Sequence, residues 1–118
     1  MIVDNWMTEY VAAWRAKDTA LLAQVLNDDI TYKTSPFAEP LVGLDAVKKF
    51  WLEATAEGEE FTITHALVAI EGDIAVLRVD VHYTAPIERT WKDLWIVQIG
   101  DDGLCFTFEE WPIEQPKD

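Results

Sequence analysis

The sequence predicts a single α+β domain in which helices cover one face of a curved sheet. Helical patterns fill most of the first half of the chain, and everything beyond about residue 60 alternates like strand. Helices first and a run of antiparallel strands afterwards is the element order of an α+β fold. The chain has 118 residues, half of them apolar and six of them tryptophan, enough for one core and too few for two. We therefore expect residues 1–118 to form one domain.

Two helical patterns open the chain. Large apolar side chains recur at helical spacing over residues 4–17, which predicts an amphipathic helix. Asp18 then stands in the place of an N-cap residue, and residues 19–26 predict a second, shorter helix. The stripe of the first helix should face the core, and its aromatic members stand four residues apart, at Trp6, Tyr10 and Trp14.

A short strand and a third helix follow. Alternation predicts a strand over residues 30–34, and two prolines and Gly43 frame the loop after it. Apolar residues return at helical spacing from residue 44 to about residue 57, so we expect a third helix there. Gly58 can adopt the left-handed conformation that ends many helices, and it should stop this one.

The second half of the chain predicts four strands joined by turns. In one of them, residues 74–84, every second residue is apolar, while Arg78, Asp80 and His82 lie on the other face. The apolar face should meet the helices, and the polar row should lie on the outer face of the sheet. Residues 114–118 are expected to form a frayed tail. We expect the strands over residues 60–70, 74–84, 89–99 and 104–112.

Two carboxylates interrupt apolar rows on the last two strands. Alternation places Asp93 on one face with Trp91 and Trp95, and it places Glu110 at the end of an apolar row on the final strand. A buried carboxylate must be paired, hydrogen-bonded or neutralised. Each acid therefore either points out of the rim of the sheet into water or belongs to a site.

The second alternative is an apolar-walled pocket between helices and sheet. Its polar groups would be the carboxyls of Asp93 and Glu110 and the hydroxyls of Tyr10 and Tyr32. Without further information, Tyr10 also fits the description of an ordinary core aromatic on a helix stripe. The sequence leaves both interpretations open.

Composition excludes several classes of function. A formal charge of −13 would repel nucleic acid and anionic membrane surfaces, so we expect neither as a partner. The first residues lack a secretory signal and no apolar run is long enough for a membrane span, which predicts a cytoplasmic protein. Cys105 is the single cysteine and is expected to be a buried strand residue. The two histidines lack ligand spacing and no phosphate or dinucleotide motif occurs, so we expect no metal and no cofactor.

The segment EYVAAWRAKDTALLAQVLNDDITYKTSPFAEPLVG resembles the opening of ketosteroid isomerase. The chain is thereby similar to the SnoaL-like, or nuclear-transport-factor-like, family. The resemblance implies a cone-shaped domain, with three N-terminal helices packed on the concave face of a curved mixed, mostly antiparallel sheet. It also implies a hydrophobic pocket and a homodimer through the outer sheet face, where Leu94 and Ile96 would otherwise be exposed. The ending resembles SnoaL-like proteins that close with an acidic residue and Trp, here Glu110 and Trp111, and this implies no particular reaction.

The resemblance places individual residues of the isomerase on this chain. Tyr10 falls where that enzyme has its oxyanion-hole tyrosine. The position of its general base is Thr34, and neither Thr34 nor Ser35 can take up a proton near neutral pH. The isomerase completes its oxyanion hole with an Asp whose raised pKa keeps it protonated; the nearest position here is Trp95, with Asp93 two residues earlier on the same face. Steroid isomerisation with the inherited base is therefore not expected.

Other enzymes of the family fit less well. A dehydratase of the scytalone type would need a histidine in the pocket, and His65 lies where the alternation breaks as at a bulge, which leaves its face undecided. An epoxide hydrolase of the limonene type would need Asp, Arg and Asp around a water. The row Arg78, Asp80 and His82 lies on the outer face, where a solvated ion-pair row or a dimer contact is the better interpretation.

The leading hypothesis is an isomerase, polyketide cyclase or dehydratase-like lyase without metal that acts on a small apolar or aromatic molecule. Its catalytic residues would be Asp93, as acid or base, and Tyr10. Its ligand-binding residues would be Trp14, Tyr32, Thr34, Trp91, Trp95 and Glu110. One alternative is a non-catalytic ligand-binding or dimerising accessory domain. Another is a pocket filled by its own aromatic side chains.

Overall fold

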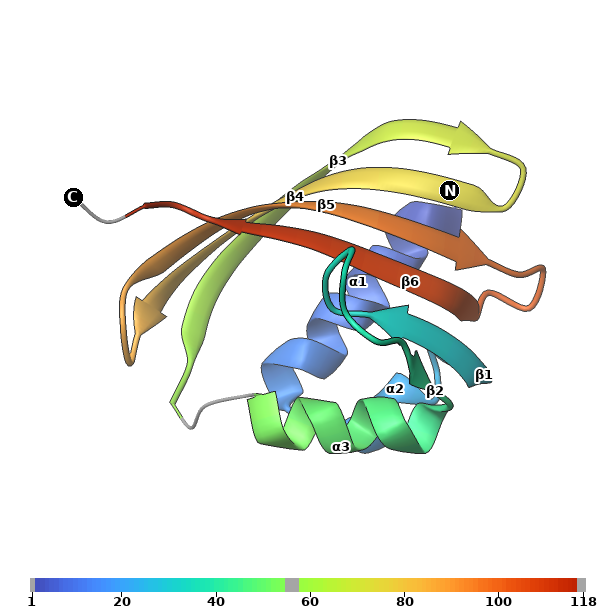
Figure 1. Cartoon of the computed structure of the whole chain (residues 1–118), viewed down its shortest axis with the longest axis horizontal. Helices are drawn as coiled ribbons and strands as arrows, with labels where there is room; N and C mark the ends of the chain where they lie inside the picture. Colours follow the sequence, from blue (N-terminus) through green and yellow to red (C-terminus); the bar gives the residue numbers. More distant parts are fainter. Residues whose placement is uncertain (1, 55–57, 117–118) are drawn as a thin grey trace.

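The structure is a computed structural model that describes residues 2–54 and 58–116, and its architecture is α+β. Helices and strands follow one another along the chain as Figure 1 shows. The elements are α1 (Ile2–Ala16), α2 (Thr19–Leu22), β1 (Leu26–Lys33), β2 (Leu41–Val42), α3 (Leu44–Ala54), β3 (Glu60–Glu71), β4 (Ile74–Ala85), β5 (Arg89–Ile99) and β6 (Cys105–Glu114).

The strands form one six-stranded mixed sheet in the order β2-β1-β6-β5-β4-β3. The β1 and β6 strands pair in parallel, and every other neighbouring pair is antiparallel. The first long strand therefore lies beside the last one, although β1 and β6 are far apart in the sequence. The expected α+β class is confirmed.

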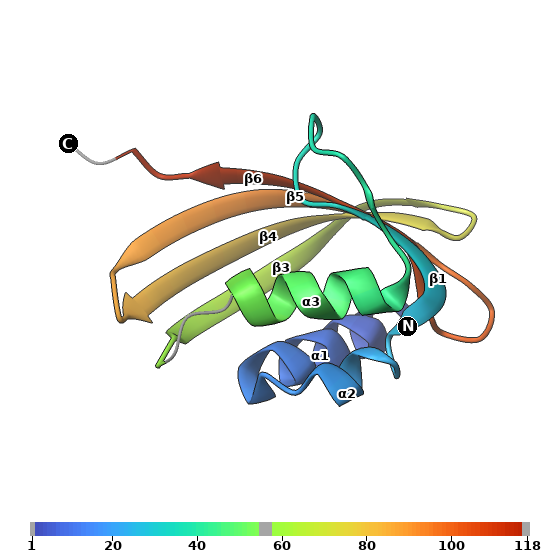
Figure 2. The same cartoon turned by 60° about the horizontal axis from the view of Figure 1, so that its bottom comes forward.

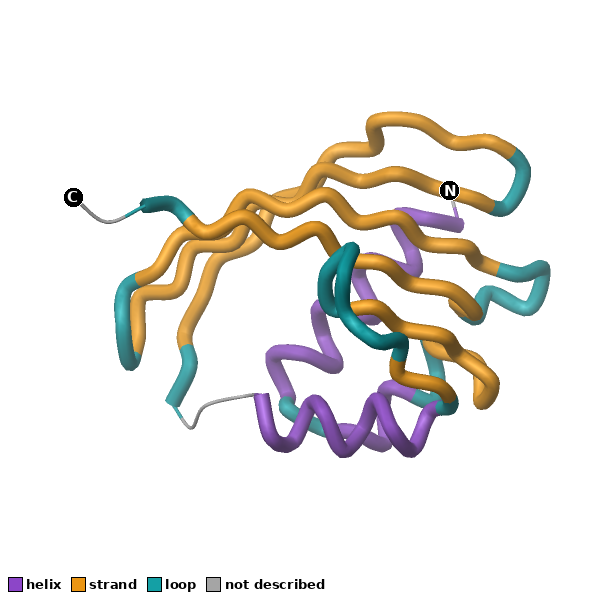
Figure 3. Tube along the Cα trace, viewed as in Figure 1, coloured by secondary structure: helices purple, strands orange, loops and turns teal. Residues whose placement is uncertain are grey.

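The helices lie on one side of this sheet, which curves around them (Figures 2 and 3). Residues on one stripe of α1 are almost fully buried, as the aromatic spacing predicts. Two of them reach the sheet directly: the Trp6 ring lies 5.7 Å from Phe108, and the Tyr10 ring lies 5.6 Å from Trp95, both measured between ring centroids. None of the described helices is long and apolar enough to cross a membrane.

Alternation along β4 matches the sequence analysis. The inner-face residues from Ala75 to Val81 are buried, and Arg78 on the opposite face is exposed. The outer row forms ion pairs: Lys92 Nζ lies 3.6 Å from Asp80, and His82 Nε2 lies 3.3 Å from Glu88. Contacts between ionisable side chains were expected on the outer face.

The second helix is shorter than predicted. Residues 19–26 were expected to be helical, but α2 ends at Leu22 and β1 already begins at Leu26. Hydrogen bonds from distant segments explain the difference, because the carbonyl of Val25 accepts from the Trp6 indole at 2.9 Å and from the Cys105 amide at 2.8 Å. These long-range bonds draw the chain into the parallel ladder with β6.

Two strand features differ from the sequence prediction. The loop before Gly43 contains the two-residue strand β2, which pairs with Thr31 and Tyr32 and was missed because its two residues carry no periodic pattern. Gly43 follows it at φ +92°. The predicted frayed tail is wrong at its start, since Glu114 belongs to β6 and the Gln115 amide donates to the Thr90 carbonyl at 2.8 Å.

The third helix and the bulge of β3 follow the sequence more closely. The α3 helix ends at Ala54, and the expected extension to residue 57 lies outside the described residues. Gly58 has a φ of +76°, and whether it ends the helix lies outside the described residues. The pairing of β3 shifts register between Leu67 and Ala69, which confirms the bulge predicted on this strand. His65 is exposed, and its Nε2 lies 3.7 Å from Asp4, away from the pocket.

Candidate functional site

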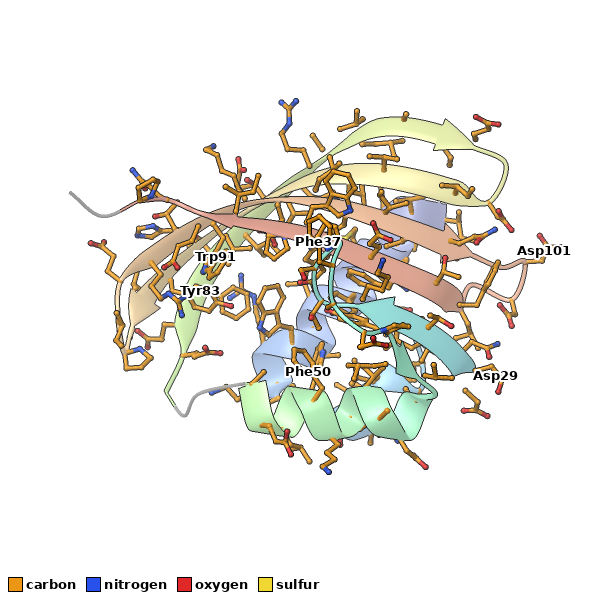
Figure 4. All side chains as sticks on the ribbon, in the orientation of Figure 1. Asp29, Phe37, Phe50, Tyr83, Trp91 and Asp101 are labelled. Carbon is orange, nitrogen blue, oxygen red and sulfur yellow. The ribbon has the colours of Figure 1, made fainter. Side chains whose placement is uncertain are left out.

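A cavity of about 470 Å³ lies between α1, α3 and the inner face of the sheet. In Figure 4, Tyr83 and Trp91 lie on the sheet side of this region, and Phe50 lies on α3 opposite them. Most of the lining is apolar or aromatic, as is usual for small-molecule sites. The residues that the sequence analysis assigned to a pocket all line it, namely Tyr10, Trp14, Tyr32, Thr34, Trp91, Asp93, Trp95 and Glu110. Their roles remain predictions.

Glu110 lies at one end of a hydrogen-bonded chain in the cavity wall, and Tyr32 is its middle member. The Tyr32 hydroxyl donates to Glu110 Oε1, although the two residues are 78 positions apart in the sequence. The contact exists because β1 pairs with β6 in parallel, with Tyr32 opposite Phe108, so that Glu110 lies two residues further along the same face. The hydroxyls of Tyr10 and Tyr32 share a second hydrogen bond. Side chains from α1, β1 and β6 are thus joined at one point.

The environment of Glu110 raises the pKa of its carboxyl to about 7. Loss of hydration is the main cause, and the negative charge of Asp93 adds to it. The hydrogen bond from Tyr32 stabilises the ionised form and opposes the shift. A carboxyl with this pKa is present in both protonation states near neutral pH, which suits it to give or to take a proton.

Asp93 lies on the inner face of β5, as the alternation predicts. The indole of Trp95 donates a hydrogen bond of 3.1 Å to its Oδ2, while its Oδ1 is buried and has no hydrogen-bond partner of ordinary geometry. Desolvation raises the pKa of this carboxyl, and the hydrogen bonds from Trp95 and from the backbone of Ile113 reduce the shift. The carboxylate form of Asp93 is therefore incompletely compensated in this cavity.

Tyr10 is embedded in aromatic side chains. Its ring stacks on Trp6 at 5.0 Å and meets Trp51 and Trp95 edge-on, each at 5.6 Å between centroids. Burial and the charge of Glu110 raise the pKa of Tyr10 well above its ordinary value. The hydroxyl is therefore a proton-bearing hydrogen-bond donor throughout the physiological range. Tyr32 has a raised pKa for the same leading reasons.

Thr34 lies on the cavity wall just beyond the end of β1. A threonine hydroxyl can donate or accept a hydrogen bond but cannot act as a base near neutral pH. The geometry therefore gives this strand end a binding role at most. The carboxyl groups among the described lining residues are those of Glu59, Asp93 and Glu110.

Several lining residues were not singled out from the sequence. Phe50 and Trp51 come from α3, and Tyr83 comes from the end of β4. Arg89 begins β5, where its guanidinium donates two hydrogen bonds to Glu114, at 2.7 and 3.0 Å, and lies 4.9 Å from the ring centroid of Trp91. The alternation that found Asp93 also contained the signal for Arg89, since both share the inner face of β5.

Within residues 2–54 and 58–116, no group of three or more His, Cys, Asp or Glu side chains is arranged to hold a metal ion. Cys105 is buried, and burial raises the pKa of its thiol to about 12. Its thiol donates a hydrogen bond of 3.0 Å to the carbonyl of Thr107. These properties are those of a structural cysteine.

Solved structures with the same fold are numerous. A candidate SnoaL-like polyketide cyclase from Shewanella denitrificans OS-217 is 14% identical, with a TM-score of 0.77 over 93% of this chain and 89% of that one. A proposed ketosteroid isomerase from Kribbella flavida DSM 17836 is 16% identical, with a TM-score of 0.72 over 97% and 79%. A computationally designed 17-OHP binder is 15% identical, with a TM-score of 0.70 over 90% and 89%.

Identities this low show a shared fold and leave the reaction open. A search among proteins of curated function finds no match. The model of the SnoaL-like domain family matches residues 7–109, which span α1 to β6 and include the Tyr10, Tyr32 and Asp93 positions of the cavity. The chain belongs to the SnoaL-like domain family.

Proposed function

We propose that this protein binds a small hydrophobic molecule in the cavity and transforms it by acid–base chemistry of the isomerase, cyclase or dehydratase kind. The observation that carries the proposal is the Glu110 carboxyl, which has a pKa of about 7 and is hydrogen-bonded to Tyr32 inside an aromatic-walled cavity. A cavity of about 470 Å³ is within the range that small-molecule sites occupy.

The proposed roles follow from the hydrogen bonds. Glu110 takes a proton from a carbon next to a carbonyl group of the ligand, or returns one to it. Tyr10, whose hydroxyl keeps its proton, turns its O–H from the Tyr32 oxygen to the ligand oxygen on which negative charge develops. Asp93 helps to hold the pKa of Glu110 near neutrality through its own charge. The sequence analysis assigned the acid or base role to Asp93, and the proposal moves that role to Glu110 because its carboxyl is the one poised near pH 7.

A ligand titration tests the binding part. Intrinsic tryptophan fluorescence should respond saturably to at least one member of a panel of steroids, polyketides and terpenoids, because Trp91 and Trp95 line the cavity. The response should change in Asp93→Asn and in Glu110→Gln. It should not change in Glu109→Gln, which removes the same charge one residue away, where Glu109 pairs with Lys33 at 3.8 Å. No saturable response from any member would contradict the proposal.

Isotope exchange tests the catalytic part. With a bound ketone in D₂O, the wild type should exchange hydrogen for deuterium at the carbon next to the carbonyl, as detected by mass spectrometry. Glu110→Gln should lose this exchange by at least about a hundredfold, the usual size of a general acid–base contribution. Exchange that persists in this variant would remove Glu110 from the reaction.

Binding without catalysis is a second candidate function. Thr34 favours this function, because it lies on the cavity wall at the position where ketosteroid isomerase has its general base, and a threonine cannot take that role. In that case ligands would bind and be recovered unchanged, and no deuterium would enter them.

We also propose that the protein forms a homodimer through the outer face of the sheet. Leu94 and Trp111 are opposite each other there, and Trp111 is exposed. Light scattering should give twice the chain mass for the wild type and a monomer for Leu94→Lys. Leu52→Lys, at an exposed leucine of α3, should stay dimeric. A monomeric wild type would contradict the proposal.

A further inference from the structure

The charges that line the cavity are unbalanced. Glu59, Asp93 and Glu110 contribute three carboxyl groups, and Arg89 is the one lysine or arginine among the described lining residues. The guanidinium of Arg89 is already engaged by both carboxylate oxygens of Glu114. An anionic ligand would therefore meet three carboxyl groups, while the one cationic side chain among the described lining residues is already paired.

The effect of this imbalance is visible at Tyr83, which lies on the β4 side of the cavity. The pKa of its hydroxyl is raised, first by desolvation and then by the negative charges of Glu59, Glu110 and Asp93. Arg89 opposes the shift with the smallest of these contributions. The electrostatic potential at this wall is thus negative, and it favours positive charge.

The walls themselves suit a cation. The electron-rich faces of aromatic rings attract cations, most strongly those of tryptophan. Four tryptophans line the cavity, namely Trp14, Trp51, Trp91 and Trp95. The structure contains one example of the interaction at this site, because the guanidinium of Arg89 lies over the ring of Trp91.

From this geometry we infer that the preferred ligand of the cavity is an organic cation, a small hydrophobic amine or quaternary ammonium compound. The inference rests on the proposed function in using the same cavity, and it names the class of ligand. The apolar body of such a ligand packs against the tryptophans. Its positive charge compensates Glu110 and Asp93, whose Oδ1 has no hydrogen-bond partner in the protein.

Two probes of the same shape separate charge from size. Phenyltrimethylammonium carries a permanent positive charge, and tert-butylbenzene is its neutral carbon analogue. Calorimetric or fluorescence titration of the full chain at about 150 mM salt, which screens the overall charge of −13, should give at least about tenfold tighter binding of the cation. Equal affinities, or tighter binding of tert-butylbenzene, would overturn the inference.

The pH dependence supplies a second readout with a definite sign. Glu110 is faced by Tyr10 of α1, Tyr32 of β1, Tyr83 of β4 and Asp93 of β5, and it is the group among them with a pKa of about 7. A cation prefers the ionised carboxylate, so its affinity should rise as the pH increases from 6 to 8. A neutral ketone that accepts a hydrogen bond from protonated Glu110 would show the opposite trend. A flat or falling profile for phenyltrimethylammonium would contradict the inference.

Matched variants locate the effect. Glu110→Gln should lose most of the preference for the cation and most of its pH dependence. Glu109→Gln removes the same charge from the neighbouring residue and should keep the preference in full. If both variants lose it equally, the preference comes from the overall charge and the inference fails. The proposed function is tested separately: it fails if no steroid, polyketide or terpenoid of the panel binds saturably, whatever the two probes do.

Discussion

The inner face of β5 and β6 has two ends that differ in kind. At the core end, defined by Trp95, Val97 and Phe108, every side chain is buried and apolar. At the cavity end, defined by Arg89, Trp91, Asp93 and Glu110, no side chain is fully buried and three of the four carry an ionisable group. The same alternation produces both ends, because the same two strands run through them.

The helices cause the difference. Trp6 and Tyr10 of α1 contact the core end directly, since both rings pack against Phe108. Figure 2 shows that the hairpin between β4 and β5 extends beyond the ends of α1 and α3. Strand residues beyond the helices are not covered by a second layer, so that polar groups can be placed there without full burial. A site can therefore be added at one end without weakening the packing at the other.

Truncation of an aromatic side chain should reveal the largest difference in stability between the two ends. Phe108→Ala should lower the free energy of unfolding by about 3–5 kcal/mol, the usual cost of emptying a large core position. Trp91→Ala, at the half-buried cavity end, should cost roughly 1 kcal/mol although the side chain is larger. Urea denaturation of both variants measures the difference. Equal losses would show that the cavity end is as tightly packed as the core end.

Replacement of Glu110 should have the next largest effect, and it should depend on pH. The pKa of Glu110 is raised from 4.5 to about 7 in the folded protein, so the folded state holds its proton more tightly than the unfolded state does. Ionisation of Glu110 therefore lowers the free energy of unfolding. This destabilisation is absent below pH 4.5, grows between pH 4.5 and 7, and is complete above pH 7.

Glu110→Gln should therefore be more stable than the wild type at pH 8, by up to about 3 kcal/mol, since one pKa unit corresponds to about 1.4 kcal/mol. Its advantage should shrink as the pH is lowered towards 4.5. Thermal or urea unfolding across this range measures the change. Glu109→Gln is the control, and a parallel pH dependence in both variants would contradict the assignment to Glu110.

The Arg89–Glu114 pair should give the smallest effect on stability. Both side chains are partly exposed, at 43% and 33%, and ion pairs of this kind contribute at most about 1 kcal/mol. Glu114→Gln should accordingly change the free energy of unfolding by less than about 1 kcal/mol. A loss of several kcal/mol would show that the cavity end depends on this pair for its fold. Denaturation in low and high salt is the measurement, because screening should reduce the effect further.

Much of the architecture could be predicted from local patterns. The bounds of β3, β4 and β5 agree with those predicted from the sequence to within a residue. A sheet with one buried face requires every second residue of a strand to be apolar, and this alternation marks the strand in the sequence. The same alternation placed Asp93 and Glu110 on the inner face, and helical spacing did the same for Tyr10 and Trp14. These residues line the cavity because each lies on the buried side of its own element, which is a local property.

Only the tertiary structure decided which of these side chains meet. The end of α2 at Leu22 depends on two hydrogen bonds to the Val25 carbonyl. One comes from Trp6, 19 positions away along the chain, and the other comes from Cys105, 80 positions away by the difference between 105 and 25. The bond between Tyr32 and Glu110 depends on the parallel register of β1 and β6. The face that each carboxyl occupies could be read from the sequence, because it follows from backbone periodicity. The pKa of Glu110 near 7 was decided by the assembled cavity, because hydration and charge depend on neighbours that local pattern does not specify.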